Sequence, residues 1–93
     1  MYITQKGASV TVTYPTVPLD VDFPSPVTIG NRIYRHPPQK IRCQQGGDVG
    51  IKYPDGSQDI IAMSDAETLP LQVVGLIGGG ITTALGLTVF YFD

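Results

Sequence analysis

Cys43 and His36 are the residues of this chain that could do nucleophilic chemistry together. A thiol becomes a nucleophile when a neighbouring imidazole lowers its pKa, and the chain has one Cys and one His. Pro37 and Pro38 stand between the two in the sequence, so they could meet only through the tertiary structure. The alternative is that His36 is exposed in a proline-rich loop and that Cys43 is a small residue packed in a strand. We favour this alternative and predict that the protein is not an enzyme.

A metal site would need several carboxylate, imidazole or thiolate groups at a suitable spacing. Asp48, Asp55 and Asp59 are the nearest candidates, but they lack the Asp-x-Asp-x-Asp-Gly pattern of a calcium-binding loop. Zinc sites need more Cys and His residues than this chain contains. We therefore expect the three aspartates to lie at strand margins and in a turn, and we predict no metal ion and no other cofactor.

The glycine run Gly78, Gly79 and Gly80 resembles in composition a loop that cradles a phosphate group. It lacks the Lys and Ser/Thr of a P-loop, and no helix is predicted after it to supply an N-terminal dipole. Glycines of this kind let two backbones approach closely, in a tight hairpin or around a symmetry axis. We therefore count these three glycines as candidate partner-binding residues.

Four of the six basic side chains gather in a short segment that contains no acid. These further candidate partner-binding residues are Arg32, Arg35, Lys40 and Arg42, and His36 lies among them. Five of the eight acids follow in the next segment: Asp48, Asp55, Asp59, Asp65 and Glu67. The pattern predicts either a basic rim that meets an acidic rim on a neighbouring copy or partner, or an ordinary solvated loop. Since the net charge is −2 and Tyr34 is the one aromatic residue of the basic segment, we expect no nucleic-acid partner.

The elements that must position these residues are predicted to be short strands in one small domain. The chain has 93 residues, of which 42% are hydrophobic and 15% charged, enough for one core. Eleven Gly and eight Pro disfavour long helices, and a single Cys excludes an internal disulfide. A small domain with so little charge often completes its burial by oligomerising or by docking on a partner.

Alternation of apolar and polar residues predicts about seven or eight short strands. In the segment 8–14, Val10, Val12 and Tyr14 alternate with Ser and Thr. The further predicted strands are 17–23, 27–34 with a break at Gly30-Asn31, 40–44, 48–53, 59–63 as the return from the turn at 54–57, and the two most apolar segments, 71–76 and 85–92. Pro18 places the strand around it at a sheet edge, and the capping-box spacing at 64–67 is interpreted as a loop. We expect an all-β domain of antiparallel strands, a small sandwich or barrel.

Two parts of the chain keep alternatives open. Residues 1–93 are expected to form one domain with its β core at 40–93, but the proline-rich residues 1–39 could be an extended or edge-strand arm over another subunit. Thr68–Phe92 carries no charged side chain and is long enough for a transmembrane helix. Pro70, the glycines and the lack of Lys or Arg at the flanks favour buried strands instead, so a membrane partner is not expected.

Short motifs in the second half of the chain resemble a family of phage structural proteins. The motifs are Gly46-Gly47-Asp48-Val49, Asp55-Gly56, Thr68-Leu69-Pro70-Leu71-Gln72-Val73-Val74, Gly79-Gly80-Ile81-Thr82-Thr83-Ala84 and a final apolar strand with Tyr91. In this order they are similar to small virion proteins of tailed phages and gene transfer agents, the head-spike base proteins. The resemblance covers about residues 40–91, although the family carries a basic residue in the segment that is uncharged here at 72–87.

The resemblance implies a non-enzymatic virion structural protein of a bacteriophage. It would be a capsid decoration (cement) protein or a head-spike base subunit, a homo-oligomer (trimer or pentamer) that docks on the major capsid protein or on a spike or fibre protein. Such a protein is made in the cytoplasm of the bacterial host and resides in the virion. A tail or head–neck adaptor, and a small viral membrane protein with one span at 68–92, are the alternatives.

Overall fold

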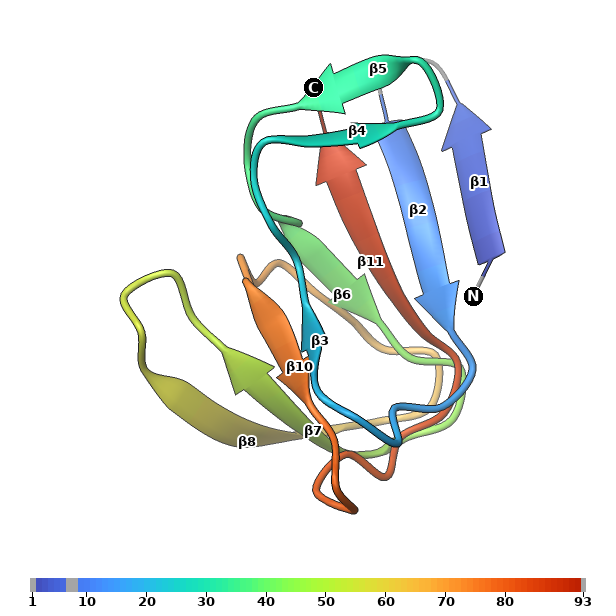
Figure 1. Ribbon diagram of the computed structural model, residues 1–93. Helices are drawn as coiled ribbons and strands as arrows, with labels where there is room; N and C mark the ends of the chain where they lie inside the picture. The colour runs from blue at the N-terminus through green and yellow to red at the C-terminus, as the bar shows by residue number, and fades with distance from the viewer. Residues whose placement is uncertain (1, 7–8, 93) are drawn as a thin grey trace.

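The computed structural model describes residues 2–6 and 9–92, and this part of the chain forms eleven short strands (Figure 1). The strands are β1 (Tyr2–Lys6), β2 (Ser9–Tyr14), β3 (Val21–Asp22), β4 (Val27–Ile29), β5 (Arg32–Tyr34), β6 (Lys40–Arg42), β7 (Gly47–Lys52), β8 (Gln58–Met63), β9 (Thr68–Leu69), β10 (Gly75–Ile77) and β11 (Leu87–Phe92). The predicted all-β, sandwich-like domain of short antiparallel strands is confirmed. The number of strands exceeds the prediction because β1 and β9 lie outside the predicted strands and the segment 27–34 forms two strands, β4 and β5.

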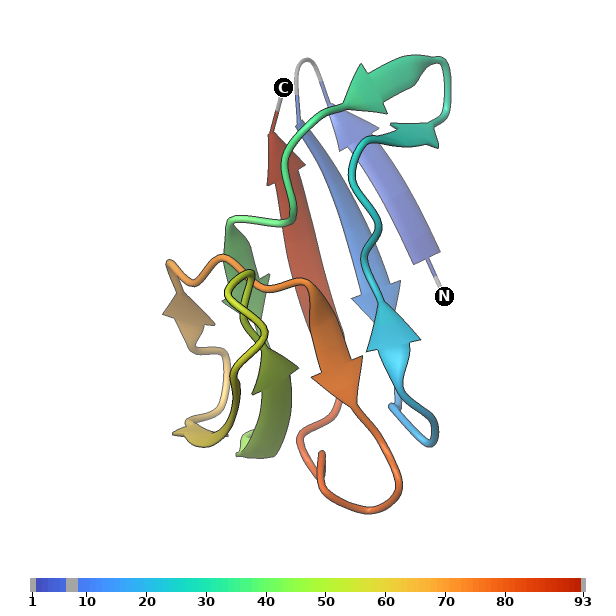
Figure 2. The same cartoon turned by 60° about the vertical axis from the view of Figure 1, so that its left-hand side comes forward.

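The described strands form two sheets and one separate hairpin. The larger sheet has the order β1-β2-β11-β6-β9, and the smaller sheet has the order β3-β10-β7-β8. β4 and β5 pair with each other and form the hairpin. Figure 1 shows the hairpin at one end of the molecule and the smaller sheet toward the other, and Figure 2 shows β10 and the hairpin in front of the larger sheet.

Side chains from both sheets share one core. In β2, Val10 and Val12 are buried, as the alternation predicts. In β11 the buried residues are Leu87, Val89 and Tyr91, and the residues between them stay half-buried. From the smaller sheet the same cluster receives Val49, Ile51 and Leu76. This packing of two inner faces is what makes the fold sandwich-like.

A row of four aromatic rings ties the hairpin and the smaller sheet to the larger sheet. The ring of Phe23, just after β3, lies 5.9 Å from that of Tyr14 and 6.5 Å from that of Tyr91. The Tyr91 ring in turn lies 5.9 Å from that of Tyr34 on β5. Edge-on and tilted ring contacts at these distances stabilise the fold in addition to the apolar surface area that the rings bury. The hairpin is therefore anchored to the core although it belongs to neither sheet.

The predicted strand 71–76 is wrong in its position. β10 begins only at Gly75, whereas Val73 lies in an irregular segment and is nevertheless buried. The N–H of Val73 donates to the carbonyl of Pro38 at 3.2 Å, so this buried backbone group is satisfied without a strand. Pro70 has no N–H to give to a ladder, which keeps the start of the segment irregular.

The predicted strands 17–23 and 27–34 are each interrupted. β3 covers two residues of the first segment and lies at an edge of the smaller sheet, as Pro18 predicts. The second segment folds back on itself as β4 and β5, because Gly30 adopts a φ of 65° in the turn between them.

The segment 64–67 is a loop, as predicted, and its capping-box residues bond to each other. The N–H of Ser64 donates to Oε1 of Glu67 at 3.0 Å, and the N–H of Glu67 donates to the Ser64 carbonyl at 3.1 Å. Ala66 between them has a φ of 59°. The first bond is one of the two bonds of a capping box, and the second is the backbone bond of a β-turn. The segment therefore closes a turn, and β9, which the alternation did not predict, follows directly.

Within the described ranges 2–6 and 9–92, no helix has the length and apolar character that crossing a membrane requires. The alternative of a single helix over Thr68–Phe92 is not formed, since this segment contains β9, β10 and β11. The glycine-rich and β-branched composition that favoured strands accounts for this outcome.

Candidate functional site

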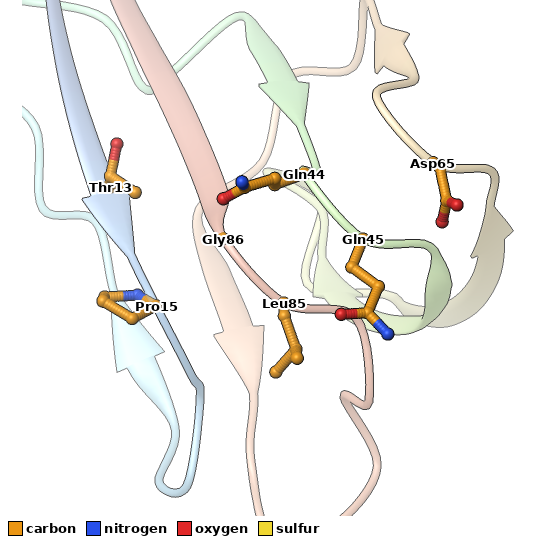
Figure 3. Close-up of a pocket in the computed structure, with 7 residues that line it drawn as sticks. All are labelled: Thr13, Pro15, Gln44, Gln45, Asp65, Leu85 and Gly86. Atoms are coloured by element: carbon orange, nitrogen blue, oxygen red, sulfur yellow. The ribbon is translucent and has the colours of Figure 1, made fainter.

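A pocket of about 590 Å³ opens beside the larger sheet (Figure 3). Its lining residues are Thr13, Pro15, Gln44, Gln45, Asp65, Leu85 and Gly86. They come from β2, from the segment after β6, from the turn between β8 and β9, and from the segment before β11. Four segments that are distant in the sequence therefore meet at this place.

Backbone hydrogen bonds hold three of these segments together. The N–H of Gln44 donates to the carbonyl of Leu85 at 3.1 Å, and the N–H of Gly86 donates to the carbonyl of Pro15 at 3.0 Å. Gly86 has a φ of 64°, and a Cβ there would lie 2.7 Å from the Cβ of Gln44. Figure 3 shows the Gln44 side chain beside this glycine. A side chain at position 86 would therefore displace Gln44 from the pocket wall.

Some of the polar groups of this pocket already form hydrogen bonds within the protein. The hydroxyl oxygens of Thr13 and Thr88 lie 2.8 Å apart, and Oδ1 of Asp65 accepts from the N–H of Gly46 at 2.6 Å. The lining residues offer two glutamine amides and a carboxylate to a polar ligand, but they do not include a nucleophile beside a general base. The sequence carries no signal for this pocket, because no local motif marks a site built from four distant segments.

A second hollow, of about 230 Å³, lies on the outer face of the smaller sheet and is apolar. In the register of β8, β7 and β10, Ile60 lies opposite Gly50, and Gly50 lies opposite Ile77. A Cβ at Gly50 would lie 2.7 Å from Cβ of Ile77 and 2.9 Å from Cγ2 of Ile81, so the glycine makes room for both. We call Ile60, Ile77 and Ile81 the isoleucine patch. Ile60 is 55% exposed and Ile81 is 40% exposed, so this apolar surface is open to solvent.

The glycine run forms part of a loop that lies against the segment before β3. The N–H of Gly78 donates to Oδ1 of Asp20 at 2.8 Å, and the N–H of Gly79 donates to the carbonyl of Pro18 at 3.0 Å. A side chain at Gly78 would collide with the backbone of Leu19. The glycine therefore lets two backbones approach, while Gly79 and Gly80 are exposed at the tip of the loop.

Carboxylates surround the isoleucine patch. Asp59 lines the hollow itself, and Asp48 lies two residues before Gly50 on the same face of β7. On the other side, Nζ of Lys52 lies 3.4 Å from Oδ2 of Asp20 and 3.6 Å from Oδ1 of Asp22. The hydrogen bond from Gly78, followed by that from Lys52, lowers the pKa of Asp20. The charges near the patch are therefore mostly negative: Asp48 shares its face of β7, Asp59 lies at the β8 edge, and the charge of Lys52 is paired with two carboxylates.

The four basic candidates do not form one cluster. Arg32 lies half-buried on β5 and Arg35 is exposed just after it, so both belong to the hairpin. Lys40 and Arg42 are exposed on β6 of the larger sheet, and the Lys40 ammonium lies 5.6 Å from the centre of the Phe92 ring. The hairpin and the glycine run lie at opposite ends of the molecule (Figure 1).

Of the residues considered for catalysis and metal binding, only Asp59 lines a hollow, and Asp48 lies beside the isoleucine patch. Cys43 is buried and its thiol donates to the carbonyl of Ser64 at 2.9 Å, whereas His36 is exposed. Asp55 lies in a turn, where hydrogen bonds from the hydroxyl and N–H of Ser57 lower its pKa. In the part of the chain that the structure describes, no group of three or more His, Cys, Asp or Glu residues is placed to hold a metal ion.

Comparison of the chain with protein-family models, with curated protein sequences and with solved structures finds no match.

Proposed function

We propose that this protein is a non-enzymatic structural subunit of a phage particle, either a capsid decoration (cement) protein or a head-spike base subunit, which associates with copies of itself. The sequence support is the order of motifs over about residues 40–91, which resembles small virion proteins. The structural observation that carries the proposal is the isoleucine patch.

The isoleucine patch favours a role in assembly because it exposes apolar area that nothing in the fold requires to be exposed. It lies on the outer face of the smaller sheet, away from the shared core and beside a hollow of about 230 Å³, and Gly50 beneath it lets Ile77 and Ile81 pack close to the backbone of β7. Contiguous apolar surface on a small protein is typical of an interaction site. Covering such surface is favourable by about 25 cal/mol per Å² of apolar area.

The proposal is tested by measuring the copy number of the protein in purified particles that carry its coding sequence, with quantitative mass spectrometry. We expect a fixed number of copies per particle. Ile60→Asp, which places a charge in the patch without touching the core, should reduce this number at least about tenfold. Thr68→Asp is the matched control, because Thr68 is exposed on β9 of the larger sheet. Absence of the wild-type protein from the particles would contradict the proposal.

A further inference from the structure

The hairpin exposes one large apolar side chain on its outward face. Thr28 and Ile33 lie opposite each other in the register of β4 and β5, and both are exposed. The residues on the other face pack toward the core, where Tyr34 is fully buried. Ile33 is 52% exposed and contributes nothing to this buried face. The hairpin lies at one end of the molecule (Figure 1). We call the exposed Ile33 side chain on its outward face the knob.

The isoleucine patch has the shape and chemistry to receive such a knob. Its hollow of about 230 Å³ is lined by Gln58, by Asp59 and by the three isoleucines of the patch. The surface within it is mostly apolar, so a branched aliphatic side chain would replace water there without losing hydrogen bonds. A fully packed centre with a polar rim is the usual anatomy of a protein interface.

The charges around the two surfaces are opposite. The segment 23–47 contains no acid, and Arg35 and His36 are exposed beside the knob. The patch is rimmed by Asp48 and Asp59, with further carboxylates around Lys52. Complementary charges of this kind orient two surfaces and disfavour patch-to-patch or knob-to-knob contacts, which would bring like charges together.

We infer that a second copy of this chain docks its hairpin on the isoleucine patch, with Ile33 in the hollow and Arg35 facing the acidic rim. The inference names the partner of the patch and rests on the proposed function in taking the patch as an interface. Two different surfaces of the molecule meet in this contact, so it is heterologous. Repetition of a heterologous contact gives a closed ring when the rotation between copies allows it, and an open chain when it does not.

Pairing of β8 edges from two copies is the competing arrangement, and one contact disfavours it. β8 lies at the edge of the smaller sheet, where an unpaired strand can accept another strand. Oδ1 of Asp59 accepts from the N–H of Ile60 at 2.8 Å, which occupies a backbone donor of that strand. Such a pairing would be isologous and would give dimers in which the hairpin has no part.

The contact is tested with two single variants of the full chain, Ile33→Asp in the knob and Ile60→Asp in the patch. Both side chains are largely exposed, so both variants should fold, which circular dichroism checks. In light scattering behind size exclusion and in sedimentation velocity, each variant alone should lose oligomers, with association weakened at least about tenfold. Thr68→Asp should associate like the wild type.

Mixing the two variants gives the decisive result. Ile33→Asp keeps an intact patch and Ile60→Asp keeps an intact knob, so one productive contact remains between them. We expect a one-to-one complex of two chains, although neither variant associates alone. An isologous contact at the patch or at the β8 edge predicts instead that Ile33→Asp assembles normally, and this outcome would overturn the inference.

A charge exchange gives a second, independent test. Arg35→Glu should weaken association, and Asp59→Lys in the partner copy should restore it when the two variants are mixed. The contact would be refuted if this rescue fails and the wild-type chain stays monomeric up to about millimolar concentration. Such an affinity would be weaker than that of a typical non-obligate contact. A monomeric chain that is still found at fixed copy number in particles would remove self-association but keep the structural role in the particle, so the two failures are distinguishable.

Discussion

The hydroxyl of Tyr34 is buried without a hydrogen-bond partner among the described residues. Its ring is fully buried and packs against that of Tyr91. Removing only the hydroxyl in Tyr34→Phe should raise the free energy of unfolding by about 1 kcal/mol, because an unsatisfied polar group is costly inside a protein. Urea unfolding measures this change. Tyr34→Leu is the control and should destabilise the fold, since it also removes the ring; a loss of stability in Tyr34→Phe would contradict the prediction.

Because of Tyr91, the stability of the folded protein should depend on pH in the alkaline range. Burial, followed by the charge of Tyr14, raises the pKa of Tyr91 from 10.0 to about 12. The unfolded chain loses the phenol proton near pH 10 while the folded chain keeps it, so stability is full below this pH and falls as the pH rises toward 12. Denaturant midpoints measured across this window should fall less steeply for Tyr91→Phe than for the wild type. Equal slopes for the two proteins would show that Tyr91 is not the group responsible.

Residue types alone predicted the behaviour of some single residues and not of others. Cys43 is packed in the interior and His36 is exposed, as expected from a lone thiol in an alternating segment and from a histidine beside two prolines. The unsatisfied hydroxyl of Tyr34 had no sequence signal, because it depends on which groups surround one atom. The same holds for Gly50, whose importance comes from its neighbours on the two adjacent strands.

The loops between the strands use glycine for two different reasons, which one pair of variants separates. Gly79 and Gly86 have nearly the same backbone, with φ of 67° and 64°. At Gly79, a Cβ would meet no described atom within 4 Å, whereas at Gly86 it would lie 2.7 Å from the Cβ of Gln44. Gly79→Ala should therefore cost about 1 kcal/mol of backbone strain, and Gly86→Ala should cost about 1–3 kcal/mol more, from the collision.

Thermal and urea unfolding of these two alanine variants check this prediction. Equal costs would mean that Gln44 moves aside freely and that the pocket wall near Gly86 is not rigid. Gly86→Ala should also alter the pocket that Gln44 helps to line, while Gly79→Ala should leave it unchanged.

At the level of elements, the alternating segments were predictable and the connections were not. β2 and β11 follow the period-two pattern because each places one face in the core, whereas β7 buries three consecutive residues and β8 buries only Met63. The segment 17–23 alternates equally well and the segment 71–76 is strongly apolar, yet both lie beside prolines, and β3 and β10 have only two and three residues. Some of their apolar side chains, such as Phe23 and Val73, are still buried, whereas Leu19 is 76% exposed. Burial in these two segments was therefore predictable only in part.

Basic and acidic side chains are distributed unevenly over the molecule, as the order of charges along the chain predicted. The basic segment contributes the hairpin, and most of the acids lie on or near the smaller sheet. The sequence did not reveal that the four cations divide between the hairpin and β6, nor that three isoleucines converge beside the acids. Both facts depend on strand order and register, which a local pattern does not encode.

This polarity predicts that salt weakens association of the chain. Raising NaCl from about 0.05 to about 0.5 M shortens the Debye length to a few ångströms and should reduce the association constant several-fold. Sedimentation velocity at a series of salt concentrations measures the change. Arg35→Ala should associate more weakly and respond less to salt. Association that strengthens with salt would indicate an apolar contact in which these charges take no part.

The sole thiol of the chain is a built-in probe for transient opening of the protein interior. Because Cys43 is fully buried and hydrogen-bonded to the Ser64 carbonyl, an alkylating reagent reaches it only when the interior opens. The rate of labelling under native conditions therefore measures the free energy of that opening without any added probe. A neighbour that binds the closed form slows the labelling in proportion to its affinity. The alkylation rate of Cys43 thus reports how readily the interior opens, both in the free subunit and in its assembled form.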